Sequence, residues 1–367
     1  MSKVYIFRTS PKNVVFDYQK LLREANYQKF LKKNAPIVLK LNLSWTRFYP
    51  ACSTPPWQLE GVIKTLIEDG FKPFQIIPVE NRTVVTNVQK GALNNHWLSV
   101  LKKYGLKMTY LTNVPYQSYT PKGKMLILDK IFPEGIELPK IIFGTNIIHL
   151  PTMKMHVFTT TTGAIKNYFG MLKTVRHFAH RYIHETITDL LTIQKEIHPG
   201  IFAVMDGTIV GSGSGPRAME WHEKNYLLAS NDQAAIDATA ARMMGFNPLT
   251  IPYLKLAQEK HLGIADSRKI EISGENLSGV NFNFKRADTF ASRGQKLIYH
   301  HLPPWLEKFL LQTIIAPWSY LASNLYHDFY WYNFVGKKRV AKFLDSSWGK
   351  VFTGYSSSWN KLNLYIK

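Results

Sequence analysis

The stretch PIVLKLNLSWTRFYPACSTPPWQLEGVIKTLIEDGFKPFQIIPV, residues 36–79, predicts a strand, a helix and a second strand in that order. Its apolar run over residues 37–43 is typical of a buried strand. Lys40 and Asn42 interrupt this run two residues apart and therefore share one face of the strand. The second strand is expected over residues 74–79. Such a unit favours a parallel sheet covered by helices.

The helix of this unit has signals at both ends: Thr54 is the expected N-cap, Pro55 the first helical residue, and Gly70 the end. The same alternation recurs along the chain. Further helices are expected over residues 95–104, 181–197, 233–244 and 251–261, and further strands over residues 107–111, 141–150, 201–205 and 226–229.

These elements predict an α/β protein of two Rossmann-like α/β halves with mainly parallel sheets, followed by an aromatic-rich, mainly helical C-terminal extension. We expect an N-terminal half over residues 1–140 and a second half over residues 141–275. The aromatic, basic extension takes residues 276–367. Its start is marked by a change in composition, because residues 309–327 contain no Asp, Glu, Lys or Arg.

The charge balance favours anionic partners. The 46 Lys and Arg against 25 Asp and Glu give a net charge of +21, which raises the concentration of any anion near the surface. Nucleic acid is the least favoured of these partners, because the basic residues are scattered and no zinc-finger, helix-turn-helix or RNP-type pattern accompanies them.

The single cysteine, Cys52, excludes an internal disulfide framework and an iron–sulfur cluster held by this chain alone. The N-terminal residues MSKVYIFRTS lack the long apolar region and the cleavage site of a secretory signal. Both features favour a cytoplasmic location.

The segment LPTMKMHVFTTTTGAIKNYFGMLK, residues 150–173, holds the densest group of candidate functional residues. Four threonines, residues 159–162, precede Gly163 and a helix-like run, so hydroxyls and free backbone N–H groups are expected at a helix N-terminus, where an anion is favoured. Lys154, His156 and Lys166 add positive or protonatable groups. The arrangement suits phosphate or carboxylate, although a threonine run before a glycine is also common as a simple strand end and cap.

A glycine-rich segment follows the strand that ends near Asp206, with Gly207, Gly211, Gly213 and Gly215. Glycines there would let backbone N–H groups approach an anion. The spacing matches neither a dinucleotide fingerprint nor a P-loop. Taken alone, the segment is better explained as a flexible turn.

Three histidines, His177, His180 and His184, have helical spacing and could bind a metal or transfer protons. A solvated or hydrogen-bonding histidine face is the favoured interpretation, since no H-E-x-x-H pattern exists and Arg176 and Arg181 lie beside them. Asp237 lies in the apolar context AAIDATAARMMG, where an ion pair with a Lys or Arg would offset the cost of burial.

Taken together, these motifs resemble the domain of unknown function 362 family (DUF362). The resemblance covers about residues 36–265 and rests on KLNL, TPPWQLEGVIKTLIEDG, LPTMKMH, TTGAIKNYFG, MDG with GSGP, and LLASNDQAAIDATAARMMGFNP. The positions that match the family pattern are Lys40, Asn42, Lys154, His156, Gly163, Lys166, Asn167, Gly170, Asp206, Gly207, Gly215, Asp232 and Asp237. Many members carry a ferredoxin-like module with clustered cysteines, which implies redox roles; this chain has no such cysteines, so electron transfer would need a redox protein partner or another cofactor.

The resulting hypothesis is an enzyme that binds a phosphorylated or carboxylated ligand between two α/β halves, with redox chemistry as the reaction class. His156 and Asp206 are the catalytic candidates, and no metal ligands are assigned. The ligand-binding candidates are Lys40, Asn42, Lys154, Thr161, Thr162, Gly163, Lys166, Asn167, Gly211, Gly213, Gly215 and Asp232. A non-enzymatic accessory protein that passes a cofactor to a redox partner, or a basic nucleic-acid-binding protein, are the alternatives.

The C-terminal extension has two interpretations. Its aromatic residues are Trp305, Trp318, Tyr320, Tyr326, Phe329, Tyr330, Trp331, Tyr332 and Phe334. They could lie at a membrane interface, with Lys337, Lys338, Arg339 and Lys342 meeting anionic lipid. The alternative is that they pack on the α/β body or form a dimer contact. A transmembrane span is not expected, because polar residues and Pro317 interrupt the run.

Overall fold

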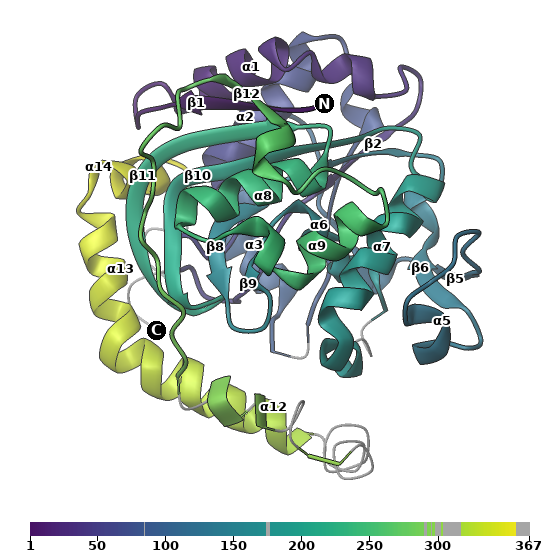
Figure 1. Cartoon of the computed structure of the whole chain (residues 1–367). Helices are drawn as coiled ribbons and strands as arrows, with labels where there is room; N and C mark the ends of the chain where they lie inside the picture. Colours follow the sequence, from purple (N-terminus) through teal and green to yellow (C-terminus); the bar gives the residue numbers. More distant parts are fainter. Residues whose placement is uncertain are drawn as a thin grey trace.

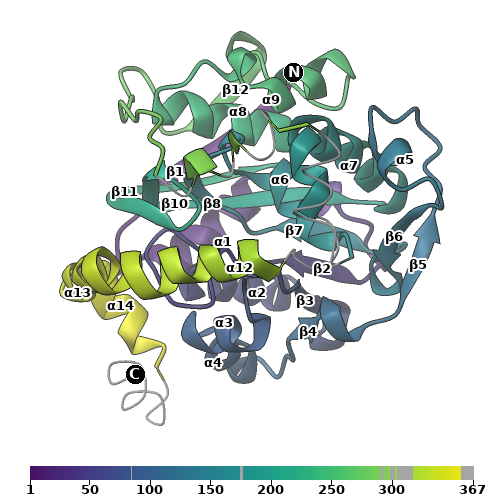
Figure 2. The same ribbon diagram turned by 90° about the horizontal axis from the view of Figure 1, so that it is seen from below.

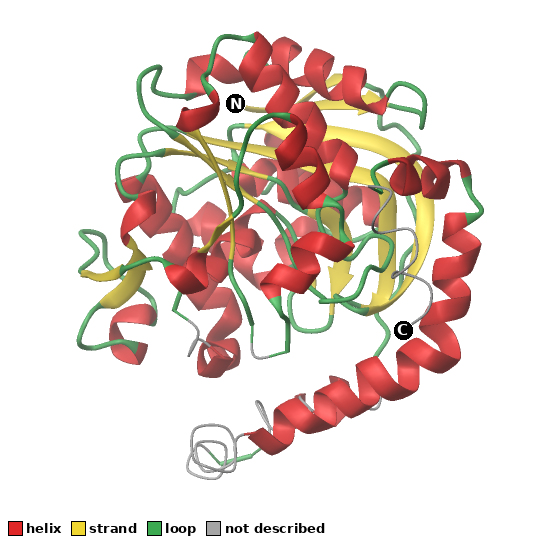
Figure 3. Ribbon diagram, turned by 180° about the vertical axis from the view of Figure 1, so that it is seen from behind, coloured by secondary structure: helices red, strands yellow, loops and turns green. Residues whose placement is uncertain are grey.

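The computed structural model describes residues 1–83, 85–173, 177–289, 292–294, 296–297, 302–303 and 317–356. Its centre is one large, mainly parallel sheet with helices on both faces, so the expected α/β class is confirmed (Figure 1). The main path of the sheet runs β12-β1-β11-β10-β7-β2-β3-β4. Figure 3 shows these strands running between two groups of helices.

The parallel part of the sheet consists of β2 (Ile37–Lys40), β3 (Ile76–Glu80), β4 (Thr109–Tyr110), β7 (Asn146–His149) and the first residues of β10 (Ile201–Ser214). β8 (Thr152–His156) also runs parallel to β10, and β9 (Thr160–Thr161) pairs antiparallel with β8. The carboxyl ends of these strands meet at one edge, which is where open α/β sheets hold ligands.

The rest of the sheet is contributed by both ends of the α/β body. β11 (Ala218–Ser230) is antiparallel to β10, and β1 (Ser2–Arg8) lies between β11 and β12 (Ile270–Gly274). The segments 1–140 and 141–275 therefore share one sheet. A separate hairpin is formed by β5 (Tyr116–Tyr119) and β6 (Ile136–Pro139).

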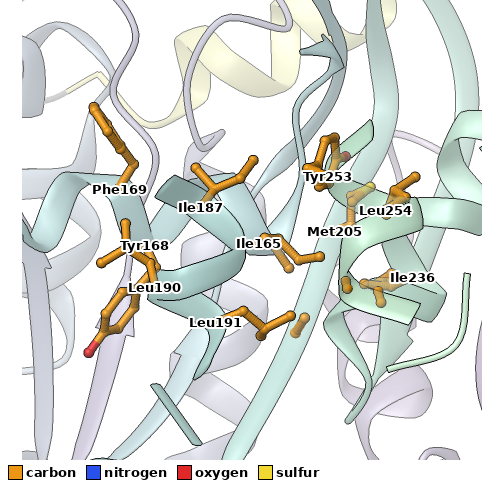
Figure 4. Packing of buried hydrophobic residues seen from close by; sticks show 14 of the residues in the cluster. Ile165, Tyr168, Phe169, Ile187, Leu190, Leu191, Met205, Ile236, Tyr253 and Leu254 are labelled. Atoms are coloured by element: carbon orange, nitrogen blue, oxygen red, sulfur yellow. The ribbon is translucent and has the colours of Figure 1, made fainter. Parts of the chain in front are cut away.

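Two hydrophobic clusters cover the two faces of the sheet. Phe202 and Val204 of β10 belong to a cluster with α1 (Val14–Glu24), α2 (Pro56–Glu68), α3 (Val88–Asn94) and α4 (Trp97–Lys103). Ala203 and Met205, which alternate with them, belong to a cluster with α5 (Leu128–Ile131), α6 (Ala164–Asn167), α7 (Ile183–Ile197), α8 (Gln233–Met244) and α9 (Pro252–Glu259). Figure 4 shows Ile165, Ile187, Met205 and Ile236 meeting in this second cluster.

Short 3-10 segments complete the body: η1 (Tyr27–Phe30), η2 (Pro73–Gln75), η3 (Leu111–Asn113), η4 (Lys140–Ile142), η5 (Tyr168–Met171), η6 (His177–Tyr182), η7 (Pro248–Thr250) and η8 (Ser267–Lys269).

Local corrections concern where elements begin and end. The helix expected over residues 95–104 is observed as α4, and a separate short helix, α3, precedes it. Pro55 rather than Thr54 is the N-cap of α2, while the Thr54 hydroxyl donates to Leu150 O. The glycine-rich segment is not a loop, because β10 continues through it to Ser214.

Residues 317–356 of the C-terminal extension are mainly helical, as expected. They form α12 (Pro317–Asn324), a π-helical stretch η9 (Leu325–Gly336), α13 (Lys337–Leu344) and α14 (Ser347–Gly354), which make an arm along one side of the body (Figure 2). Trp331 of the arm packs on Trp45 and Tyr49 at ring distances of 6.0 and 5.4 Å. Trp305 lies outside the described residues. No helix in the described part of the chain is long and apolar enough to cross a bilayer.

Candidate functional site

Four basic side chains converge near the carboxyl end of β8. His156 is the last residue of β8, Lys166 lies in α6, His180 in η6, and His184 in the first turn of α7. We call these four residues the histidine–lysine cluster. The four residues come from four different elements. Two of these elements, α6 and α7, are in contact and lie side by side in Figure 2.

His156 is the buried centre of the cluster, with 7% of its surface exposed. Its Nδ1 accepts the backbone N–H of Phe158 at 3.2 Å, so the proton of the neutral ring is on Nε2. Burial holds the pKa of His156 well below its ordinary value, and the nearby Lys166, His180, Lys154 and His184 lower it further. At pH 7 the His156 ring is therefore neutral and offers its Nε2–H as a hydrogen-bond donor.

The other members form a half-buried rim around His156. His180 meets the edge of the Phe169 ring at 4.8 Å, and the Lys166 ammonium lies 5.7 Å from the centre of the same ring. His184 stacks on Tyr253 with an interplanar angle of 12°. These aromatic contacts fix the orientation of the basic groups, while their partial exposure leaves the rim accessible to a solute.

Lys154 lies beneath this rim and is fully buried. Its ammonium donates to Asn42 Oδ1, to Cys52 O at 2.7 Å and to Thr152 Oγ1 at 2.7 Å. Burial lowers the pKa of Lys154 to about 7. Through these contacts, Lys154 and Asn42 tie the loop after β2 to β8. Because the three N–H donors of the ammonium are used by these acceptors, Lys154 would act on a ligand through its charge.

Lys40 has a similar internal partner. Its ammonium lies 2.8 and 2.9 Å from the two carboxylate oxygens of Glu80, and both side chains are buried. The Asn167 side chain donates to Lys40 O at 2.9 Å, and Asn81 donates to Gly170 O at 3.0 Å. These contacts hold the segment after α6 against the ends of β2 and β3.

The expected free N–H groups at the start of α6 are occupied by the protein itself, which corrects that expectation. The Asp237 carboxylate of α8 accepts the N–H of Ala164 at 2.7 Å and that of Ile165 at 3.1 Å. A Cβ on Gly163 would overlap this carboxylate, so the close approach requires glycine. An ion pair of Asp237 with Lys or Arg, one expectation from sequence, is replaced by these backbone contacts.

Thr161 and Thr162 are buried and bond to Tyr253 and to backbone oxygens of β8.

Asp237→Asn is expected to remove a pH dependence of stability. Burial raises the pKa of Asp237 to about 8, against the lowering effect of the two N–H donors. A carboxyl whose pKa is higher in the folded than in the unfolded state binds more protons when folded, so the free energy of unfolding falls as pH rises from about 4 to 8. Urea denaturation of both proteins at pH 5.5 and pH 8 measures this, and an equal pH slope in parent and variant would contradict the assignment.

Asp206 and Asp232 lie apart from the cluster. Asp206 accepts hydrogen bonds from Tyr18 of α1 at 2.6 Å and from Trp57 of α2 at 2.9 Å, and it lines a small cavity of about 20 Å³. Asp232 caps α8 by accepting the N–H groups of Ala234 and Ala235. Both carboxylates are therefore engaged in fixing helices to the sheet.

Gly211 and Gly213 lie in β10 and Gly215 lies between β10 and β11, so most of the segment favoured as a flexible turn is strand. Gly211 pairs with Lys154 of β8. At Gly215, a Cβ would overlap the backbone oxygen of Met155, so glycine is needed for the close approach of the hairpin to β8. The glycines shape the sheet beside the cluster.

Sequence reasoning did not select His180 and His184 as site residues, and it overlooked Arg286, whose guanidinium bonds to the Thr160 hydroxyl. The four-residue spacing of the two histidines is the feature of the sequence that could have indicated them, because it places both on one side of a helix. His177 lies in η6, but its side chain is outside the described ones. In the described ranges, no group of three or more His, Cys, Asp or Glu side chains could hold a metal ion.

Comparison with known proteins gives two matches. Residues 37–242 match the profile of the family described as "Domain of unknown function (DUF362)". The chain is also similar to the thylakoid-associated protein sll1697 of Synechocystis sp. (strain ATCC 27184 / PCC 6803 / Kazusa), with 26% identity over 241 residues, which cover 64% of this chain and 70% of the relative. No solved structure matches. The profile spans β2 to α8 and includes the whole histidine–lysine cluster.

Proposed function

The chain belongs to the DUF362 family, and from this premise we propose that it binds a small anionic ligand, a phosphate or a carboxylate, at the histidine–lysine cluster. The proposal rests on one observation: Lys166, His180 and His184 gather through shared aromatic contacts on a half-buried rim around the buried His156. Their mutual repulsion in a partly buried place is relieved when an anion lies among them.

The groups differ in what they offer to such a ligand. The Nε2–H of His156 is a buried donor, and the Lys166 ammonium approaches from α6 on the half-buried rim. Lys154 adds charge from below, since its three donors are already used. A charged donor in a place of low dielectric makes a stronger hydrogen bond to phosphate or carboxylate than a neutral one.

Lys166→Ala is expected to abolish most of the stabilisation that the protein gains from inorganic phosphate. A ligand that binds only the folded state raises the melting temperature, and removal of its charged contact reduces this rise. Differential scanning fluorimetry over a phosphate series at constant ionic strength measures the rise. We expect the apparent Kd to increase about tenfold or more, which corresponds to the loss of one charge-assisted hydrogen bond.

Lys173→Ala is the matched control. Lys173 is seven residues further along and is exposed, with its ammonium paired to Glu137 at 2.7 Å. This variant should keep the parent's response to phosphate. An equal response of the Lys166→Ala variant and the parent would count against the proposed site.

We also propose peripheral association with a membrane. The printed name of the relative associates that protein with thylakoids, and we transfer to this chain only the idea that it works beside a bilayer. This proposal is independent of anion binding at the cluster. Flotation of the full chain with vesicles tests it.

A further inference from the structure

We propose that one exposed apolar face of the C-terminal arm docks on the surface of a bilayer that contains anionic lipid. This inference rests on the proposed membrane association and deepens it, because it names the surface and the lipid chemistry. We call the surface the apolar arm face; it consists of Leu321, Leu325, Phe329, Tyr330 and Phe334.

The side chains of this face are open to solvent to an unusual degree. Their exposed fractions run from 53% for Leu325 to 71% for Phe329. These residues follow one another at intervals of about four or five positions. In a helix whose hydrogen bonds run from i to i+5, as in η9, residues at such intervals lie on the same side. The five residues therefore form one continuous stripe rather than scattered exposed positions.

The opposite side of the same helix holds the arm on the body. Ser323, His327 and Trp331 are buried, and Ser323 accepts a hydrogen bond from Arg217 at 3.0 Å. Trp45 of the body donates to Asp328 of the arm. Since one side of the helix is fixed by these contacts, the exposed apolar arm face is held in a defined orientation.

Basic residues continue the stripe. Lys338 and Lys342 follow Phe334 at intervals of four residues in α13, and both are exposed. Residues 317–344 contain four Lys or Arg and one acidic residue, Asp328. Arg339 donates to Met219 O at 2.7 Å and so adds to the contacts that hold the arm on the body.

This charge pattern favours an anionic bilayer over a second copy of the chain. Two copies meeting through the same face would bring the lysines of two chains of net charge +21 together. Anionic headgroups supply the opposite charge, while the Phe and Leu side chains enter the boundary between headgroups and acyl chains. Tyr330 suits this depth, because tyrosine favours the headgroup region.

The test is flotation of the full chain with phosphatidylcholine vesicles that contain either no phosphatidylglycerol or 30% of it, about the anionic content needed to attract basic segments. The parent should float with the anionic vesicles. Leu325→Ser combined with Phe329→Ser should weaken binding about tenfold or more, because two apolar side chains are removed from the boundary. Lys338→Glu combined with Lys342→Glu should weaken binding to anionic vesicles by a similar factor, since each lysine near the surface contributes.

Matched controls use exposed residues of the body. Phe74→Ser removes an 84% exposed phenylalanine, and Lys32→Glu with Lys33→Glu reverses two exposed lysines. Both control proteins should float like the parent. Urea denaturation of the arm variants should give the parent's stability, as expected for exposed positions.

The remaining outcomes overturn the proposal in distinguishable ways. A parent that fails to float rejects membrane association itself. Equal flotation of the parent and the Leu325→Ser, Phe329→Ser protein keeps membrane association and rejects the apolar arm face. A dimeric parent and a monomeric variant in gel filtration without lipid would assign the face to a contact between two copies.

Discussion

Asp206→Ala is expected to lower the free energy of unfolding by about 3–5 kcal/mol, because buried donors left without a partner cost about 1–3 kcal/mol each. The Asp206 carboxylate accepts hydrogen bonds from Tyr18, Trp57 and Thr208. Removal of the carboxylate leaves these donors, and the backbone N–H of Thr208, without their acceptor in the core. Burial raises the pKa of Asp206, and its hydrogen-bond donors oppose this rise. The substitution also removes the free-energy cost of burying the carboxylate, and the expected value already includes this gain.

Urea denaturation followed by tryptophan fluorescence and by circular dichroism measures the loss. Asp129→Ala, at an exposed carboxylate, is the control and should change the midpoint little. We expect the response of Asp206→Ala to phosphate to equal that of the parent, because Asp206 contacts α1 and α2 rather than the histidine–lysine cluster. A variant that keeps its stability and loses the phosphate response would restore Asp206 to the ligand site, where the sequence suggested it.

Glu80→Gln is expected to cost a similar amount, about 3–5 kcal/mol, because it leaves the ammonium of Lys40 buried without its counter-charge. Lys40 and Glu80 are 1% and 4% exposed, and both carboxylate oxygens contact the ammonium. One oxygen of Glu80 also accepts the N–H of Asn81 at 2.8 Å, so the pair holds the turn after β3.

A double-mutant cycle separates the ion pair from packing. Lys40→Met in the Glu80→Gln background removes the unpaired charge, so the double variant should be more stable than Glu80→Gln alone. Glu24→Gln is the control: it breaks the half-exposed pair of Lys20 and Glu24 and should leave the midpoint unchanged. A double variant that is less stable than Glu80→Gln would show that the aliphatic part of Lys40, and not its charge, carries the effect.

The first prediction concerns Asp206, and the second concerns Lys40 through its partner Glu80. Sequence patterns grouped Asp206 and Lys40 with the ligand site. In the structure, Lys40, Lys154, Asp206 and Asp237 each have internal partners, and they fix loops and helices at the carboxyl edge of the sheet. Lys166, which we propose to meet the ligand, is partly exposed. The family pattern therefore includes both buried polar residues and a residue proposed to meet the ligand.

The sequence by itself determined the class of fold and many of its elements. The helix expected over residues 233–244 is observed as α8 over Gln233–Met244, because a capping Asp232 before it and Gly245 after it are local signals. Of the apolar run over residues 37–43, residues 37–40 form β2 and residues 41–43 lie in the loop that follows it. Sequence also located the motif-rich segment after β7 and the helical extension, since both show in composition and spacing.

Only the tertiary structure decided what each polar residue does. Lys40 meets Glu80 forty positions away, Asp237 meets the N–H groups of α6 seventy-three positions away, and His180 reaches His156 through Phe158. In the arm, the turn of η9 places Trp331 on the body and Phe329 in solvent, although both belong to one aromatic run. Burial and pairing depend on which distant segments come together, and local propensity carries no information about that choice.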